Sequence, residues 1–213
     1  MRLNLRKLAS VSTVSALAIG AAALTGLTPA NAATDGSGVV INEVYASGGS
    51  AGAPYTHKFV ELANPTDADV DLSGWSLQYR KADGTGNATG IAALSGSIPA
   101  HGYYLVQFNS NGTQGAALPA ADATSTVALQ GQNGTIVLSR SASALNVGTG
   151  SVIGNPDVVD LIGYGKSNTF ETAAAPTTSG NQDHRSRTRT NGVDIDNNSV
   201  DFTLIDAPTP CNT

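Results

Sequence analysis

The sequence predicts an all-β domain, either a sandwich or a barrel, and three observations lead to that prediction. Gly, Ala, Ser, Thr, Asn and Asp dominate the chain after residue 32, whereas the helix formers Lys, Glu and Leu are scarce. Short runs of β-branched and aromatic residues recur between residues that favour turns. No segment keeps the 3.6-residue hydrophobic period of an amphipathic helix.

Residues 1–32 differ from the rest and read as a secretory signal peptide. The first seven residues carry three basic side chains and no acid, an apolar run follows at 11–27, and Ala30-Asn31-Ala32 is a small-x-small cleavage site. Ser, Thr and Gly interrupt the apolar run, which disfavours the alternative of an N-terminal membrane anchor. We therefore expect a secreted protein without membrane insertion, with residues 33–37 as a short disordered N-terminus.

The expected mature chain is acidic and has one cysteine. Cleavage leaves eight basic residues against sixteen acidic ones, a net charge of −8, which disfavours nucleic acid as a partner. Cys211 cannot form an internal disulfide, so the core alone must hold the domain together. We expect one monomeric domain over residues 38–206, followed by a frayed C-terminal tail at 207–213.

Alternation of apolar and polar residues marks the expected strands. The clearest case places Trp75, Leu77 and Tyr79 on an inward face and the polar residues between them on an outward face. The core is expected to include Trp75, Leu77, Tyr79, Phe59 and Ile41. Strands are expected at 39–44, 59–63, 75–80, 103–108, 135–140, 158–164 and 202–205.

Turn chemistry separates these strands. Asn133-Gly134 lies between the apolar runs 127–129 and 135–138 and predicts a β-hairpin there. Residues 141–157 and 170–182 are small, polar and without period, so we expect them to be long surface loops.

The order and spacing of several motifs resemble the lamin tail domain family, in its bacterial secreted form. No single motif is specific, but together they cover Val39 to Pro210. The matching segments are Ile41-Asn42-Glu43-Val44, Phe59-Val60-Glu61-Leu62 with Asn64, Asp71 to Leu77, Ile98 to Val106, Gly134 to Leu138, Val159 to Gly165, Asp194 to Asn198 with Asp201-Phe202, and Pro208-Thr209-Pro210.

This resemblance implies an immunoglobulin-like β-sandwich and no particular activity. In bacteria such domains accompany extracellular nucleases, phosphatases or cell-surface modules. We therefore expect a non-catalytic extracellular binding or structural module, whose partner is an extracellular protein or a cell-surface polymer. The alternatives are a nucleic-acid-binding accessory domain of the nuclease or phosphatase type, and a weak hydrolase.

Two features bear on the hydrolase alternative. Glu43 and Glu61 in the first two strands could form an acid–base pair, but strand residues of this kind are more often solvent-facing or locally hydrogen-bonded. Gly48 to Gly52 fits the G-x-S-x-G pattern around Ser50, yet a strand rather than a helix is expected after it. We expect no catalytic residue.

Arg185, Arg187 and Arg189 alternate with smaller residues and would share one face of a strand. That face could bind an anion, because guanidinium groups match phosphate and carboxylate oxygens. The pattern favours a structural role instead, as a charged edge strand or as the partner of Asp194 and Asp196.

Asp194, Asp196 and Asn198 have the spacing of the first ligands in a calcium loop. A serine stands where an EF-hand needs glycine, and an isoleucine where it needs a bidentate Glu, so an EF-hand is excluded. A looser calcium site completed by Asp201 or by residues from another loop stays open, as does an Asx-rich turn that caps its own backbone. No other cofactor is expected.

Overall fold

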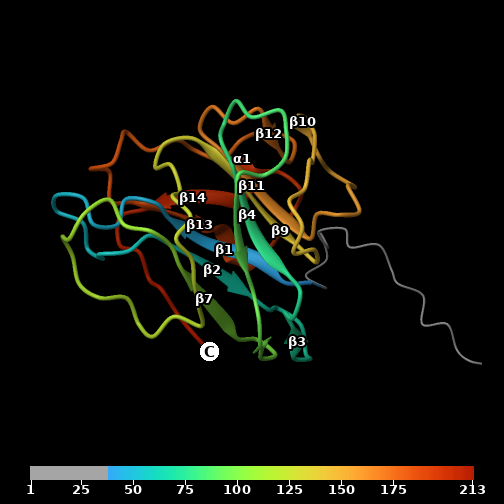
Figure 1. The fold of residues 1–213 in the computed structure, drawn as a ribbon, viewed down its shortest axis with the longest axis horizontal. Coiled ribbons are helices and arrows are strands. Elements are labelled where there is room, and N and C mark those ends of the chain that lie inside the picture. Colours follow the sequence, from blue (N-terminus) through green and yellow to red (C-terminus); the bar gives the residue numbers. More distant parts are fainter. Residues whose placement is uncertain (1–37) are drawn as a thin grey trace, which may run out of the picture.

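The structure is a computed structural model that describes residues 38–213, so the predicted signal peptide and residues 33–37 lie outside the described part. Two β-sheets face each other in the arrangement of an immunoglobulin-like sandwich, as predicted (Figure 1). The larger sheet has the order β14 (Phe202–Ile205), β13 (Ser186–Arg189), β1 (Val40–Tyr45), β2 (Phe59–Ala63), β7 (Tyr103–Gln107) and β8 (Ala123–Thr124).

The second sheet has the order β11 (Asp160–Tyr164), β9 (Gly134–Ser139), β4 (Ser76–Arg80) and β5 (Gly90–Ala93). Two small pairs flank the sandwich: β3 (Val70–Asp71) with β6 (Ser97–Ile98), and β10 (Gly150–Ser151) with β12 (Thr169–Phe170). A 3₁₀ turn, η1 (Thr190–Gly192), and one helical turn, α1 (Asn198–Asp201), precede β14. No helix in the described part of the chain is long and apolar enough to span a membrane.

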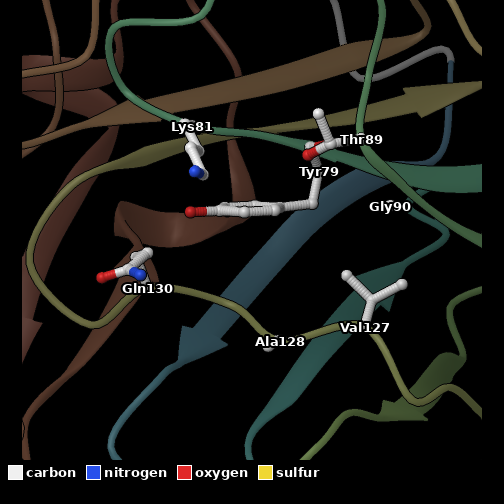
Figure 2. Close-up of a pocket in the computed structure, with 7 residues that line it drawn as sticks. All are labelled: Tyr79, Lys81, Thr89, Gly90, Val127, Ala128 and Gln130. Atoms are coloured by element: carbon white, nitrogen blue, oxygen red, sulfur yellow. The ribbon is translucent and has the colours of Figure 1, made fainter.

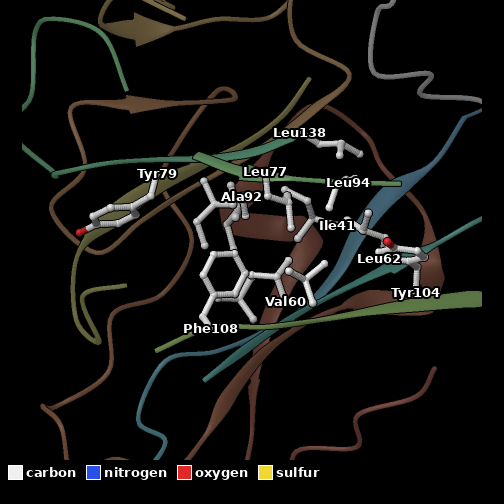
Figure 3. Packing of buried hydrophobic residues seen from close by; sticks show 14 of the residues in the cluster. Ile41, Val60, Leu62, Leu77, Tyr79, Ala92, Leu94, Tyr104, Phe108 and Leu138 are labelled. Carbon is white, nitrogen blue, oxygen red and sulfur yellow. The ribbon is translucent and has the colours of Figure 1, made fainter. Parts of the chain in front are cut away.

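The core lies between the two sheets and contains the inward-facing residues of both (Figure 3). All five predicted core residues are buried, with Trp75 the most exposed of them at 8%. Burial of aliphatic and aromatic side chains at roughly 25 cal/mol per Å² is the main stabilising term for a domain without a disulfide. The alternation thus placed Ile41, Trp75, Leu77 and Tyr79 in this core, whereas Phe59 packs in a separate apolar cluster with Tyr45 and Leu105.

The outer face of β4 differs from the prediction, because its polar residues are buried as well. Residues of the expected surface loop 141–157 fold over this face: Gln78 donates to the carbonyls of Ser141 and Ser143 and accepts the N–H of Leu145. A second apolar cluster, formed by Val137, Val147, Val152, Val158 and Leu161, lies under the same loop. The polar residues of β4 thus satisfy loop backbone instead of facing water.

The predicted hairpin at Asn133-Gly134 is wrong. Residues 127–129 form no strand, and β9 pairs with β4 on one side and β11 on the other. Both edges of β9 are occupied by strands distant in sequence, so a hairpin partner has no place beside it.

Candidate functional site

The three arginines of the predicted anion-binding face lie in different surroundings. The side chain of Arg185 is 39% exposed and pairs with Asp183 at 2.7 Å, which lowers the pKa of Asp183 well below its usual range. Arg187 is buried, with its guanidinium 4.3 Å from the centre of the Tyr164 ring. Arg189 is also buried, so two of the three point into the sandwich, where a dissolved anion does not reach them.

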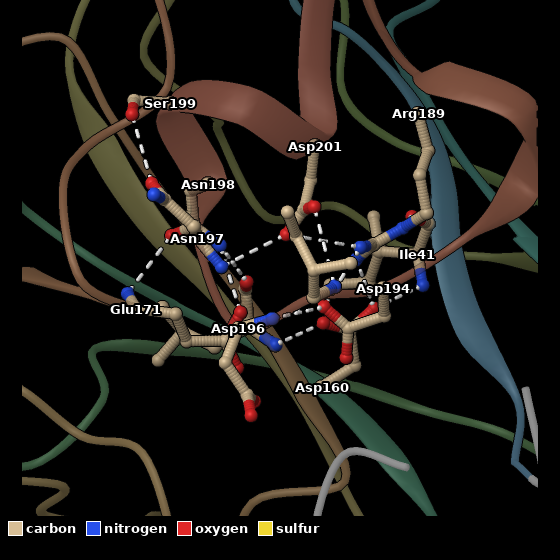
Figure 4. A network of polar contacts seen from close by, with 12 residues as sticks. Ile41, Asp160, Glu171, Arg189, Asp194, Asp196, Asn197, Asn198, Ser199 and Asp201 are labelled. Carbon is tan, nitrogen blue, oxygen red and sulfur yellow. Dashed lines mark hydrogen bonds and ion pairs between the residues drawn. The ribbon is translucent and has the colours of Figure 1, made fainter. Parts of the chain in front are cut away.

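Arg189 is the centre of a buried polar cluster between β11 and the closing segment, which we define as residues 186–206 (Figure 4). Its guanidinium is 2.7 Å from Asp160 Oδ2, 3.0 Å from Asp194 Oδ1 and 3.5 Å from Asp201 Oδ2, and Nε donates to the carbonyl of Ile41. All four charged side chains are at most 2% exposed. The cluster ties the closing segment to both sheets.

Asn198 and Glu171 complete the cluster. The Asn198 amide donates to the carbonyl of Leu161 and to Glu171 Oε2, both at 2.8 Å, and its oxygen accepts the N–H groups of Gly163 and Glu171. Burial, reinforced by the nearby Asp160 and Asp194 carboxylates, raises the pKa of Glu171 to about 10.

The residues predicted as calcium ligands therefore do not all point to one place: some bind backbone groups, and one converges with other carboxylates. Asp201 accepts backbone N–H groups of residues 195 and 197, and partly exposed Asp196 donates its own N–H to Asp194. Among the described acidic side chains, Asp194 instead converges with Asp160 and Glu171, one oxygen from each lying within 4.8 Å of the others.

Sequence reasoning missed Asp160 and Glu171. Asp160 could have been found, because it is a lone charge inside the apolar run 158–164. Glu171 lies in a segment without pattern, and only the fold brings it to the cluster.

Glu43 and Glu61 lie opposite each other on β1 and β2 and each is 1% exposed, so of the two expected placements, solvent-facing or hydrogen-bonded, the structure shows the hydrogen-bonded one. They accept hydrogen bonds from the C-terminal tail: the Thr209 N–H donates to both oxygens of Glu43, and the Cys211 N–H donates to Glu61 at 2.6 Å. Burial raises the pKa of both carboxyl groups, that of Glu61 to about 7.

The tail is consequently not frayed. It crosses the outer face of the larger sheet and ends at Asp122, which accepts the N–H of Thr213 at 3.3 Å. Pro208 and Pro210 are buried in this crossing. Unpaired tail N–H groups and buried glutamates satisfy each other, a complementarity that the strand pattern does not reveal.

Two hollows of about 320 and 410 Å³ that share lining residues open beside Tyr79, at one end of the second sheet. Figure 2 shows the smaller one. Tyr79, Lys81 and Gln130 line both hollows, and Lys166 and Asp83 line the larger one. The buried phenol oxygen of Tyr79 has no hydrogen-bond partner of good geometry among the described residues. The lining of the larger hollow combines the edge of a mostly buried aromatic ring, two ammonium groups, one carboxylate and two side-chain amides.

Ser50 does not form a nucleophile elbow. Its Oγ accepts a hydrogen bond from Asn111, and the chain after it leads into β2 rather than into a helix. The sharp strand-to-helix turn of that motif is therefore missing at this serine.

A family model described as Lamin Tail Domain matches residues 32–166. The chain belongs to the lamin tail domain family. This is a family of non-enzymatic immunoglobulin-like domains, in agreement with the sandwich described above. A search of curated proteins found no match. Among solved structures, the chain is similar to a DUF4876 family protein from Bacteroides thetaiotaomicron VPI-5482, at 11% identity and a TM-score of 0.47, with 78% of this chain and 70% of that chain covered.

The lamin tail match extends from the first strand through β11. The hollows beside Tyr79 lie within it, as does Asp160. Glu171 and the closing segment lie beyond it, although β13 pairs directly with β1 in the same sheet. The buried cluster thus joins the matched part of this lamin tail domain to the part that follows.

Proposed function

We propose that this lamin tail domain is secreted and acts outside the cell as a non-catalytic module that binds a cell-surface polymer at the hollows beside Tyr79. One observation carries the proposal. Of the eight Lys and Arg residues at positions 38–213, four are buried, and two of the remaining four, Lys81 and Lys166, line one hollow of an otherwise acidic protein.

The lining fits a saccharide unit that carries a negative charge. Lys81, Lys166 and the Gln130 amide supply hydrogen-bond donors for carboxylate and hydroxyl oxygens, and the small exposed part of the Tyr79 ring adds apolar contact. Tyr79, Lys81 and Gln130 lie around one space in Figure 2, and the hollows fall within the size range of small-ligand sites.

The nucleic-acid alternative receives less support. The arginines that might have gripped phosphate are buried or paired with Asp183, so no continuous basic stripe remains among the described residues.

The test is calorimetric titration of residues 33–213 with an oligogalacturonide, using a neutral malto-oligosaccharide as control. We expect binding of the acidic probe, lost in Lys81→Ala/Lys166→Ala. Arg140→Gln also removes an exposed positive charge but lies outside the lining, so it should bind as the parent does. Equal affinity of the double variant and the parent, or no binding of the acidic probe, would contradict the proposal.

A further inference from the structure

We propose that the buried cluster of Asp160, Glu171 and Asp194 holds a divalent cation of about the size of calcium, which fastens the closing segment to β11. This ligand set shares only Asp194 with the residues that the sequence spacing suggests. The proposal rests on three features of the cluster: its charge, one unpartnered oxygen and the arrangement of its oxygens.

The cluster has too little positive charge. Four carboxylates, those of Asp160, Glu171, Asp194 and Asp201, face the single guanidinium of Arg189, a formal excess of three negative charges. Buried carboxylates stay ionised only when they are paired or bind a metal.

One oxygen lacks any partner. Asp194 Oδ1 accepts hydrogen bonds from Arg189 and the N–H of Asp196, whereas Asp194 Oδ2 is buried and has no hydrogen-bond partner within residues 38–213. The side chain of Asp194 is 0% exposed, so water does not reach this oxygen from outside. Leaving a buried charged acceptor unsatisfied costs several kcal/mol, which a cation at this place would remove.

The oxygens are arranged for a shared ion. Asp160 and Asp194 each use one oxygen for Arg189 (Figure 4). The other oxygen of Asp160 accepts one N–H, that of Leu161, and keeps a lone pair for a cation, whereas Asp194 Oδ2 has both lone pairs free among the described residues. The distance of at most 4.8 Å among the oxygens of Asp160, Glu171 and Asp194 suits ligands around one ion with bonds of 2.3–2.6 Å. An all-oxygen carboxylate set favours calcium over zinc or copper.

The experiment uses residues 33–213. Because every ligand side chain is buried, the protein is unfolded in guanidinium with EDTA, refolded without metal, and then compared with protein refolded in calcium. We expect close to one bound calcium per chain by elemental analysis. At ten times its dissociation constant, calcium should favour the folded state about elevenfold, seen as a higher melting temperature.

Two variants identify the site. Glu171→Gln should abolish the rise in melting temperature with calcium. Asp196→Asn removes a carboxylate of the closing segment that is not among the converging ligands, so this variant should keep the rise. Two results would overturn the proposal: no bound metal together with equal melting temperatures in EDTA and calcium, or a calcium effect that Glu171→Gln retains. If a proton instead of a cation neutralises Glu171, the protein should bind no metal, and Glu171→Gln should be at least as stable as the parent.

Discussion

At the scale of single residues, burial decides which side chains matter for stability. Trp75 lies in the core and also carries Arg140 at 5.1 Å over its ring. Truncation to Ala leaves a large cavity, so we expect the free energy of unfolding to fall by about 3–5 kcal/mol. Trp75→Phe should lose much less. Guanidinium denaturation measures the free energy of unfolding of both variants. A Trp75→Ala variant as stable as the parent would contradict the assignment of Trp75 to the core.

Glu61 is the residue whose charge should shape the pH dependence of stability. Burial raises its pKa from 4.5 to about 7, so the folded state binds a proton more tightly than the unfolded state. Proton binding by Glu61 therefore stabilises the folded state fully below pH 4.5. This stabilisation, on the order of 3 kcal/mol of unfolding free energy, is lost as the pH rises through about 7.

Glu61→Gln removes this titration, and its amide can still accept the Cys211 N–H while Asn42 rotates its own amide to accept from it. We therefore expect the variant to gain stability relative to the parent as the pH rises from 4.5 to 8. Denaturation curves at several pH values measure the difference. A constant gap between the two proteins would show that Glu61 ionises at its ordinary pKa.

At the scale of elements, the C-terminal tail covers both glutamates and should control their titration. A chain that ends at Asp206 returns Glu43 and Glu61 to water, so their pKa values should fall towards ordinary values. We expect this truncation to lower stability more at pH 5 than at pH 8.

Thr209→Pro provides the point variant, since it removes the N–H that Glu43 accepts, and Thr209→Ala keeps that N–H as its control. Hydrogen exchange of the tail amides reports whether the tail remains in place. A truncated protein with the pH profile of the intact one would contradict the role assigned to the tail.

At the scale of the whole molecule, the alternation of apolar and polar residues predicted which apolar strand residues are buried. Ile41 and Leu77 lie in alternating strands and are buried between the two sheets, whereas Phe59 is buried in a separate cluster with Tyr45 and Leu105. The loop over Gln78 could not be predicted, because loop backbone pairs with strand side chains without any periodic signal. The same holds for Glu171, which tertiary contacts alone bring to Arg189.

Ligand binding beside Tyr79 depends on the complete fold, because the residues that line the hollow come from β4, β5 and the segment before β9. The most direct measurement is the amide NMR spectrum of residues 33–213 titrated with the oligogalacturonide. We predict saturable shifts confined to residues around Tyr79, Lys81, Gln130 and Lys166. Shifts centred on another face of the sandwich, or none at saturating probe, would contradict the binding site proposed here.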